Sequence, residues 1–145
     1  MAVLPVGIDW RQLLSADDGY VLCPGAAGGE VAAAETAPAA VFGGDLREVY
    51  LASDGVFDRP GQWFVIWPLS EVATRKRQAG SLEGSPVRRG LVGFGDDGTG
   101  APFCVPRDGS GGVFAWSAID GEATRLADTV ARFWEGWLTG TLPPH

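Results

Sequence analysis

A glycine-rich stretch, LVGFGDDGTGAPFCV at residues 91–105, holds the residues whose spacing most suggests chemistry. Gly93, Gly95 and Gly98 match G-x-G-x-x-G, the pattern that cradles a dinucleotide pyrophosphate. That pattern works where a strand leads through the glycines directly into a helix, whose N-terminal amides face the phosphates. Here Thr-Gly-Ala-Pro and then an apolar, strand-like run follow Gly98. The sequence therefore predicts a turn, with no nucleotide cofactor.

Two acids inside this stretch raise the question of a metal site. Asp96 and Asp97 carry the hard oxygen ligands that calcium prefers. The EF-hand spacing, however, requires a bidentate Glu at the twelfth position, and this chain has Arg107 there. A looser ion site at the two aspartates stays an alternative, but we predict no metal.

A β-hairpin between Phe94 and Phe103 accounts for the same residues more simply. Its connection needs several positive φ angles, which Gly95, Gly98 and Gly100 can adopt without a Cβ penalty. The two aspartates can accept hydrogen bonds from the backbone of their own turn. We therefore interpret the stretch as a hairpin.

Catalytic groups are scarce elsewhere in the chain. The only histidine is His145, the last residue, so a Ser-His-Asp or Cys-His system has no base, and zinc sites with histidine ligands are excluded. The remaining enzymatic hypothesis is a carboxylate-only hydrolase or transferase, using Asp96 with Asp97 or with Asp54. Adjacent aspartates on an exposed turn lack the separate environments that divide acid from base. We predict no catalytic residues and no enzyme activity.

Composition bounds the class of protein. The chain has 145 residues, 46% of them hydrophobic, and a net charge of −7 from 11 basic and 18 acidic residues. This length predicts a single domain over residues 1–145. The acidity disfavours nucleic-acid binding, which needs a basic surface, and it suits either a basic protein partner or simple solubility.

Other features bear on location. No apolar run approaches the ~20 residues of a membrane span, and the start MAVLPVGIDW lacks the basic and apolar regions of a signal peptide. Cys23 and Cys104 form no C-x-x-C motif, and we expect both to be free thiols. These features predict a cytoplasmic protein. Ten arginines against one lysine indicate a GC-rich bacterial genome.

Periodicity and turn residues predict an α+β fold: a central, mainly antiparallel sheet, flanked by N-terminal helices and a C-terminal amphipathic helix. The closing helix is the clearest element, because five apolar residues recur at helical spacing on one face. Those residues are Val130, Phe133, Trp134, Trp137 and Leu138. The predicted helices cover residues 10–14, 28–37, 46–53 (with Asp45 as N-cap), 69–73 and 128–139. The predicted strands cover residues 20–22, 62–67, 90–95, 102–106 and 112–117, with a polar loop at 80–89.

The order of these elements resembles the SUKH superfamily, which groups fungal cell-wall-synthesis regulators with bacterial immunity proteins that neutralise toxins. The matching pieces are DLREVYLASDGV (45–56), WFVIWPLSEV (63–72), LVGFGDDGTGAPFCV (91–105) and GGVFAWSAIDGEATRLADTVARFWEGWL (111–138). The resemblance covers roughly residues 28–139, which leaves an N-terminal extension at 1–27, an added strand or arm, and a frayed tail at 140–145. The family usually has Leu-Pro before the helix that begins at Asp45, whereas this chain has Val-Phe-Gly-Gly.

The resemblance implies a protein that acts by binding. It implies an immunity protein that binds and neutralises a bacterial toxin domain, such as a basic nuclease; a regulatory adaptor unrelated to toxins is the alternative.

Candidate partner-binding residues come from turns and from one strand. Acids near predicted turns can gather at one end of a sheet, and exposed tryptophans make strong binding residues. Two tryptophans four residues apart in a strand share a face, so one of that pair is expected to meet a partner. Trp116, Trp134 and Trp137 are expected in the core. The candidates are Asp54, Asp58, Asp96, Asp97, Trp63 and Trp67, with Asp108 and Asp120 as further turn acids.

Overall fold

The fold is a seven-stranded antiparallel sheet in which every strand pairs only with its neighbours along the chain, in the order β1-β2-β3-β4-β5-β6-β7. The computed structural model describes residues 8–36, 43–72, 74, 90–117 and 119–144. The strands are β1 (Tyr20–Leu22), β2 (Val56–Asp58), β3 (Trp63–Ile66), β4 (Leu91–Asp96), β5 (Pro102–Pro106), β6 (Val113–Ser117) and β7 (Glu122–Ala127). The predicted α+β class is confirmed. The predicted loop at 80–89 lies outside the described residues.

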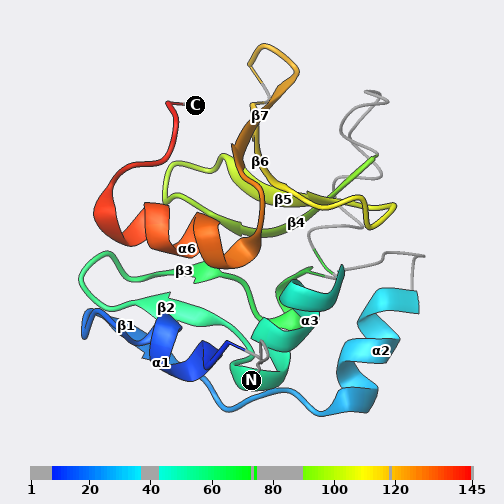
Figure 1. Ribbon diagram of the computed structural model, residues 1–145, viewed down its shortest axis with the longest axis vertical. Helices are drawn as coiled ribbons and strands as arrows, with labels where there is room; N and C mark the ends of the chain where they lie inside the picture. The colour runs from blue at the N-terminus through cyan, green and yellow to red at the C-terminus, as the bar shows by residue number, and fades with distance from the viewer. Residues whose placement is uncertain (1–7, 37–42, 73, 75–89, 118, 145) are drawn as a thin grey trace, which may run out of the picture.

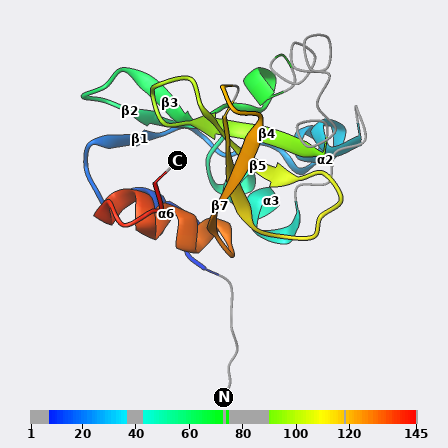
Figure 2. The same cartoon turned by 90° about the horizontal axis from the view of Figure 1, so that it is seen from above.

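In the described part of the chain, four helices accompany the sheet: α1 (Trp10–Leu14), α2 (Gly28–Thr36), α3 (Gly43–Ala52) and α6 (Val130–Thr139). Residues 69–72 form a further helical turn, where the sequence predicts one. In Figure 1, α6 lies in front of the strands, and Figure 2 shows it and α3 on the same side of the sheet. None of the helices in the described part of the chain is long and apolar enough to cross a bilayer.

The core forms where α6 packs on the sheet. Phe133 is fully buried and meets Phe94 of β4 and Phe103 of β5 edge to face, with ring centroids 5.8 and 4.7 Å apart. Trp134 is fully buried as well, while Trp137 is partly buried. The apolar stripe predicted from spacing thus faces the sheet, because the helical period places these residues on one side.

The N-terminal segment joins this core through two indole groups of α6. The Trp134 Nε1–H donates to the carbonyl oxygen of Leu13 (3.1 Å), and the Trp137 Nε1–H donates to the Tyr20 hydroxyl (2.7 Å). Leu14 of α1 is fully buried in the same apolar cluster. The strand foreseen in the extension is β1, which pairs with β2 and forms one edge of the sheet.

Two strands, β2 and β7, were absent from the sequence prediction. β2 has three residues, and β7 carries Glu122 and Arg125 with Leu126 as its one buried residue. Neither segment has the apolar alternation that marks a half-buried strand. Both form because a neighbouring strand supplies the hydrogen-bonding partner, which no local pattern reveals.

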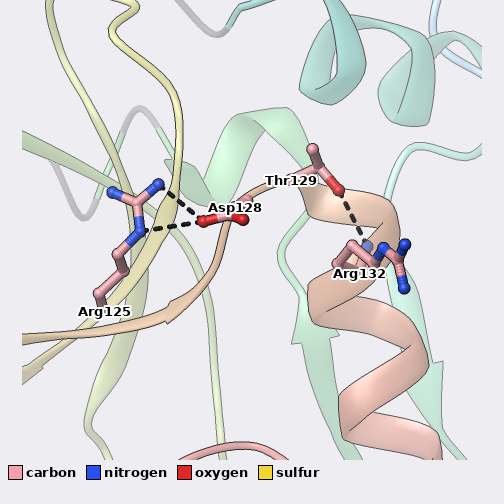
Figure 3. A network of polar contacts seen from close by, with 4 residues as sticks. All are labelled: Arg125, Asp128, Thr129 and Arg132. Atoms are coloured by element: carbon pink, nitrogen blue, oxygen red, sulfur yellow. Dashed lines mark hydrogen bonds and ion pairs between the residues drawn. The ribbon is translucent and has the colours of Figure 1, made fainter.

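One carboxylate connects the beginnings of two helices. Asp45 accepts hydrogen bonds from its neighbour Leu46 N–H and from Val130 N–H, both at 2.9 Å, so it stands at the N-termini of α3 and α6. A negative charge is favourable there because it meets the free amides and the positive end of the helix dipole. Figure 3 shows the rest of the α6 start: Thr129 accepts from Arg132 N–H (3.1 Å), and Arg125 pairs with Asp128 (3.1 Å).

Replacing Asp45 should therefore destabilise the protein more than replacing Asp128. We expect Asp45→Ala to cost about 1–2 kcal/mol of unfolding free energy, because two backbone donors lose their acceptor. Asp128→Ala, which removes only an exposed ion pair, should change stability little. Urea denaturation followed by tryptophan fluorescence measures both; equal midpoints would contradict the role given to Asp45.

Candidate partner-binding site

Three loops leave their strands at the same end of the sheet. In an antiparallel meander, the β2–β3 turn, the β4–β5 loop and the β6–β7 loop all fall at the same end, while α3 and the β5–β6 loop meet the opposite end. The acids at the three-loop end are Asp58, Asp96, Asp97 and Asp120, and those at the other end are Asp54 and Asp108. The structure thus brings four predicted turn acids to one end and separates two from them.

Asp96 is the centre of the three-loop end. One carboxylate oxygen accepts the Gly98 N–H (2.7 Å), and the other accepts the indole N–H of Trp67 (3.2 Å). The main-chain carbonyl of Asp96 accepts the indole N–H of Trp63 (3.1 Å). Both predicted tryptophans therefore converge on this one residue. Trp67 itself is 4% exposed, so its indole holds Asp96 in place from within the core.

Trp63 is held between two backbones. A Cβ on Gly61 would lie 2.0 Å from the ring, and a Cβ on Gly98 would lie 3.2 Å from it. The indole also meets Trp137 of α6 edge to face, with centroids 6.4 Å apart. Glycine at both positions leaves room for the ring, and Trp63 stays partly exposed.

The glycines of the β4–β5 hairpin serve two different purposes. Gly98 and Gly100 take positive φ (89° and 96°), as the hairpin interpretation predicts. For Gly95 that prediction is wrong: its φ is not positive, and it is needed because a Cβ would lie 1.9 Å from the Val65 carbonyl oxygen on β3. The pairing of β4 with β5 also shifts register between Gly93 and Gly95.

The adjacent aspartates build the loop itself. Asp97 accepts hydrogen bonds from the Thr99 backbone N–H (2.9 Å) and hydroxyl (2.6 Å), one residue beyond the bond from Asp96 to Gly98. Each carboxylate thus closes a turn two residues ahead, as expected for Asp in such loops. The result is a loop closed by its own hydrogen bonds, between Trp63 and the next hairpin.

Asp58 and Asp54, two more of the predicted acids, also accept backbone hydrogen bonds. Asp58 accepts Gly61 N–H (2.8 Å) in the β2–β3 turn, and Asp54 accepts Leu69 N–H (2.8 Å) where the short helix begins. Near Asp54, burial raises the pKa of the Tyr50 phenol well above its usual range, and the Asp54 charge adds to that rise. Tyr50 therefore stays protonated and donates to the Trp67 carbonyl (2.7 Å).

A hollow of about 290 Å³ lies on the other side of the β4–β5 loop. At its mouth is Ile119, in the β6–β7 loop, with 99% of its surface exposed. The described lining is Thr99, Gly100, Ala101, Ala115, Trp116, Ser117, Ile119 and Thr124. Sequence reasoning did not find this hollow, since its lining comes from two strands, β6 and β7, and from the β4–β5 and β6–β7 loops. The sequence signal that could have indicated it is Ile119, a β-branched residue in a loop next to Asp120-Gly121.

Other features of the described residues are weaker candidates. A more open groove of about 490 Å³ lies beside Arg125 and Arg132, near the start of α6 shown in Figure 3. Another, of about 560 Å³, borders Asp17 and Asp18. Within the described ranges, no three His, Cys, Asp or Glu side chains are grouped as metal ligands would be.

These elements define the protein as an α+β domain. An antiparallel meander carries the aromatic helix α6 on one face, and an Asp-Gly hairpin joins β4 to β5. The model of the SMI1 / KNR4 family (SUKH-1) matches residues 25–136 of this chain, so the chain belongs to that family, and the resemblance predicted from the sequence is confirmed. A search of curated proteins found no match.

The close approach at Gly95 can be tested by adding one methyl group. We expect Gly95→Ala to destabilise the protein strongly, since the new Cβ would force β3 away from β4. Gly100→Ala meets no neighbour within 4 Å and should cost only the ~1–3 kcal/mol of a positive φ. Chemical denaturation of both variants measures the order. A Gly95→Ala protein as stable as Gly100→Ala would refute the close-contact explanation.

The Cys23 thiol offers a second test at the opposite end of the sheet. Burial, and then the charge of Asp54, raise the pKa of the Cys23 thiol. Asp54→Asn keeps an acceptor for Leu69 but removes the charge, so the pH profile of Cys23 alkylation by iodoacetamide should move to lower pH. Peptide mass spectrometry separates this from Cys104, whose buried thiol should stay unmodified in the folded protein. An unchanged profile would mean that Asp54 does not act on the thiol.

Proposed function

We propose that this protein is a cytoplasmic immunity protein of bacterial type, which binds a toxin domain and neutralises it without catalysis. The observation that carries the proposal is the three-loop end of the sheet, where hydrogen-bonded turns hold acids and one exposed apolar residue in fixed positions. A preorganised surface binds with less loss of conformational entropy than a flexible one. Membership of a family that resembles immunity proteins supports the same conclusion.

The charge of the chain favours a basic partner, such as a nuclease domain. A net charge of −7 would attract a basic protein over a distance and raise the association rate at low salt. In this proposal Asp58, Asp97 and Trp63 contact the partner. Asp96 and Trp67 hold the loop that presents them, and Asp54, at the other end, contributes only to the overall field.

Co-expression with the toxin domain encoded by the adjoining gene tests this function. We expect the cells to survive and the two proteins to elute together on a sizing column. The association rate should fall as salt rises from 50 to about 500 mM, because ions screen the charges. Continued killing with no complex would overturn the immunity function and leave the regulatory adaptor, the alternative within the family.

A matched pair of variants connects the function to the surface. Asp58→Lys reverses a charge at the three-loop end, and Asp108→Lys makes the same change at the opposite end. Both variants change the net charge by the same amount and should slow association equally through the overall field. Only Asp58→Lys should slow it further, because Asp58 contacts the partner in this proposal.

A further inference from the structure

The hollow beside the β4–β5 loop has the chemistry of an anchor pocket. Trp116 (4% exposed) and Ala115 (3% exposed) come from β6, and Gly100 and Ala101 come from the β4–β5 loop. No lysine or arginine is among the described residues that line it. At about 290 Å³ it is just below the ~300–1,000 Å³ of small-molecule sites, which suits a single side chain.

Ile119 extends the apolar surface beyond the hollow. A lone exposed apolar residue is ordinary on a protein surface. This one, however, lies in a hairpin loop, where Gly, Asn and Asp dominate, and it stands at the mouth of an apolar hollow. Figure 1 shows that the β6–β7 hairpin projects from the top of the molecule. Ile119, in the loop of this hairpin, is 99% exposed and therefore open to a partner.

Carboxylates flank the same loop. Asp120, next to Ile119, accepts the Glu122 N–H (3.1 Å), and both side chains are exposed. An approaching segment would therefore meet an apolar centre with negative charge on its border. This is the usual plan of a protein interface, in which an apolar anchor fills a pocket and charged residues at the rim select the partner.

We propose that this hollow receives one apolar side chain from a basic protein segment, with Ile119 packing against that side chain and Asp120 and Glu122 facing the basic residues on either side. The inference rests on the proposed binding function and deepens it, because it names the surface and the chemistry of the partner. The charge complementarity favours a basic protein over a neutral small molecule as the occupant.

A short peptide tests the surface without knowledge of the toxin. The probe is acetyl-Lys-Arg-Leu-Arg-Lys-amide, titrated into the whole protein, with acetyl-Glu-Asp-Leu-Asp-Glu-amide as the charge-reversed control. The readout is the set of backbone amide shifts in ¹H–¹⁵N NMR spectra. We expect the basic peptide to shift the amides of Thr99, Gly100, Trp116 and Ile119, and the acidic peptide to leave them unchanged.

Two lysine variants complete the test. Ile119→Lys should weaken binding of the basic peptide at least tenfold, whereas Leu51→Lys, at an exposed apolar residue (44%) on α3, should leave binding unchanged. Shifts elsewhere, no shifts, equal binding of both peptides or an unaffected Ile119→Lys protein would each overturn the proposed surface. A negative result with the peptides would overturn this surface only. The immunity function is tested separately, by the survival of cells in the toxin assay.

Discussion

The packing of the aromatic face of α6 against the sheet is the contact on which the remaining structure depends. Phe133 reaches β4 and β5 together, so one helix fixes the position of the two central strands. The indole N–H groups of Trp134 and Trp137, also on α6, donate to Leu13 and Tyr20, which lie more than a hundred residues earlier in the chain. These hydrogen bonds satisfy polar groups that burial would otherwise penalise. The end of the chain thereby holds its beginning in place.

The same helix supports the three-loop end through Trp63, which lies between Trp137 and the backbone of the β4–β5 loop. Acids that sequence reasoning selects for binding turn out to be acceptors for their own turns, as Asp96 and Asp97 demonstrate. The Asp96 carboxylate, which also accepts the Trp67 indole N–H, has little freedom to move toward a partner. We therefore divide the surface into residues that hold its shape and residues, such as Ile119, that extend from it.

Local patterns explain what the sequence could predict. The helix of residues 130–139 and the Asp-Gly hairpin were foreseen, because periodicity and turn chemistry act over a few neighbouring residues. β2 and β7 were not, since their stability comes from pairing with other strands. The sequence suggested a positive φ at Gly95, and that explanation is wrong. Glycine is required there because the Val65 carbonyl on another strand lies too close for a Cβ. The hollow depends on Thr99, Trp116 and Thr124 meeting in space, which no single segment reveals.

The neighbour-to-neighbour order of the sheet has an evolutionary consequence. Because each strand hydrogen-bonds only with the strands next to it in the chain, a longer or altered hairpin loop leaves the register of every distant strand unchanged. Loop insertions at a surface cost little entropy and disturb few contacts. The length of one hairpin loop can therefore change while α6 and the central strands keep the same shape, although the β2–β3 turn and the β4–β5 loop both meet Trp63. Such a scaffold can change the surface of its loops without a change in its core.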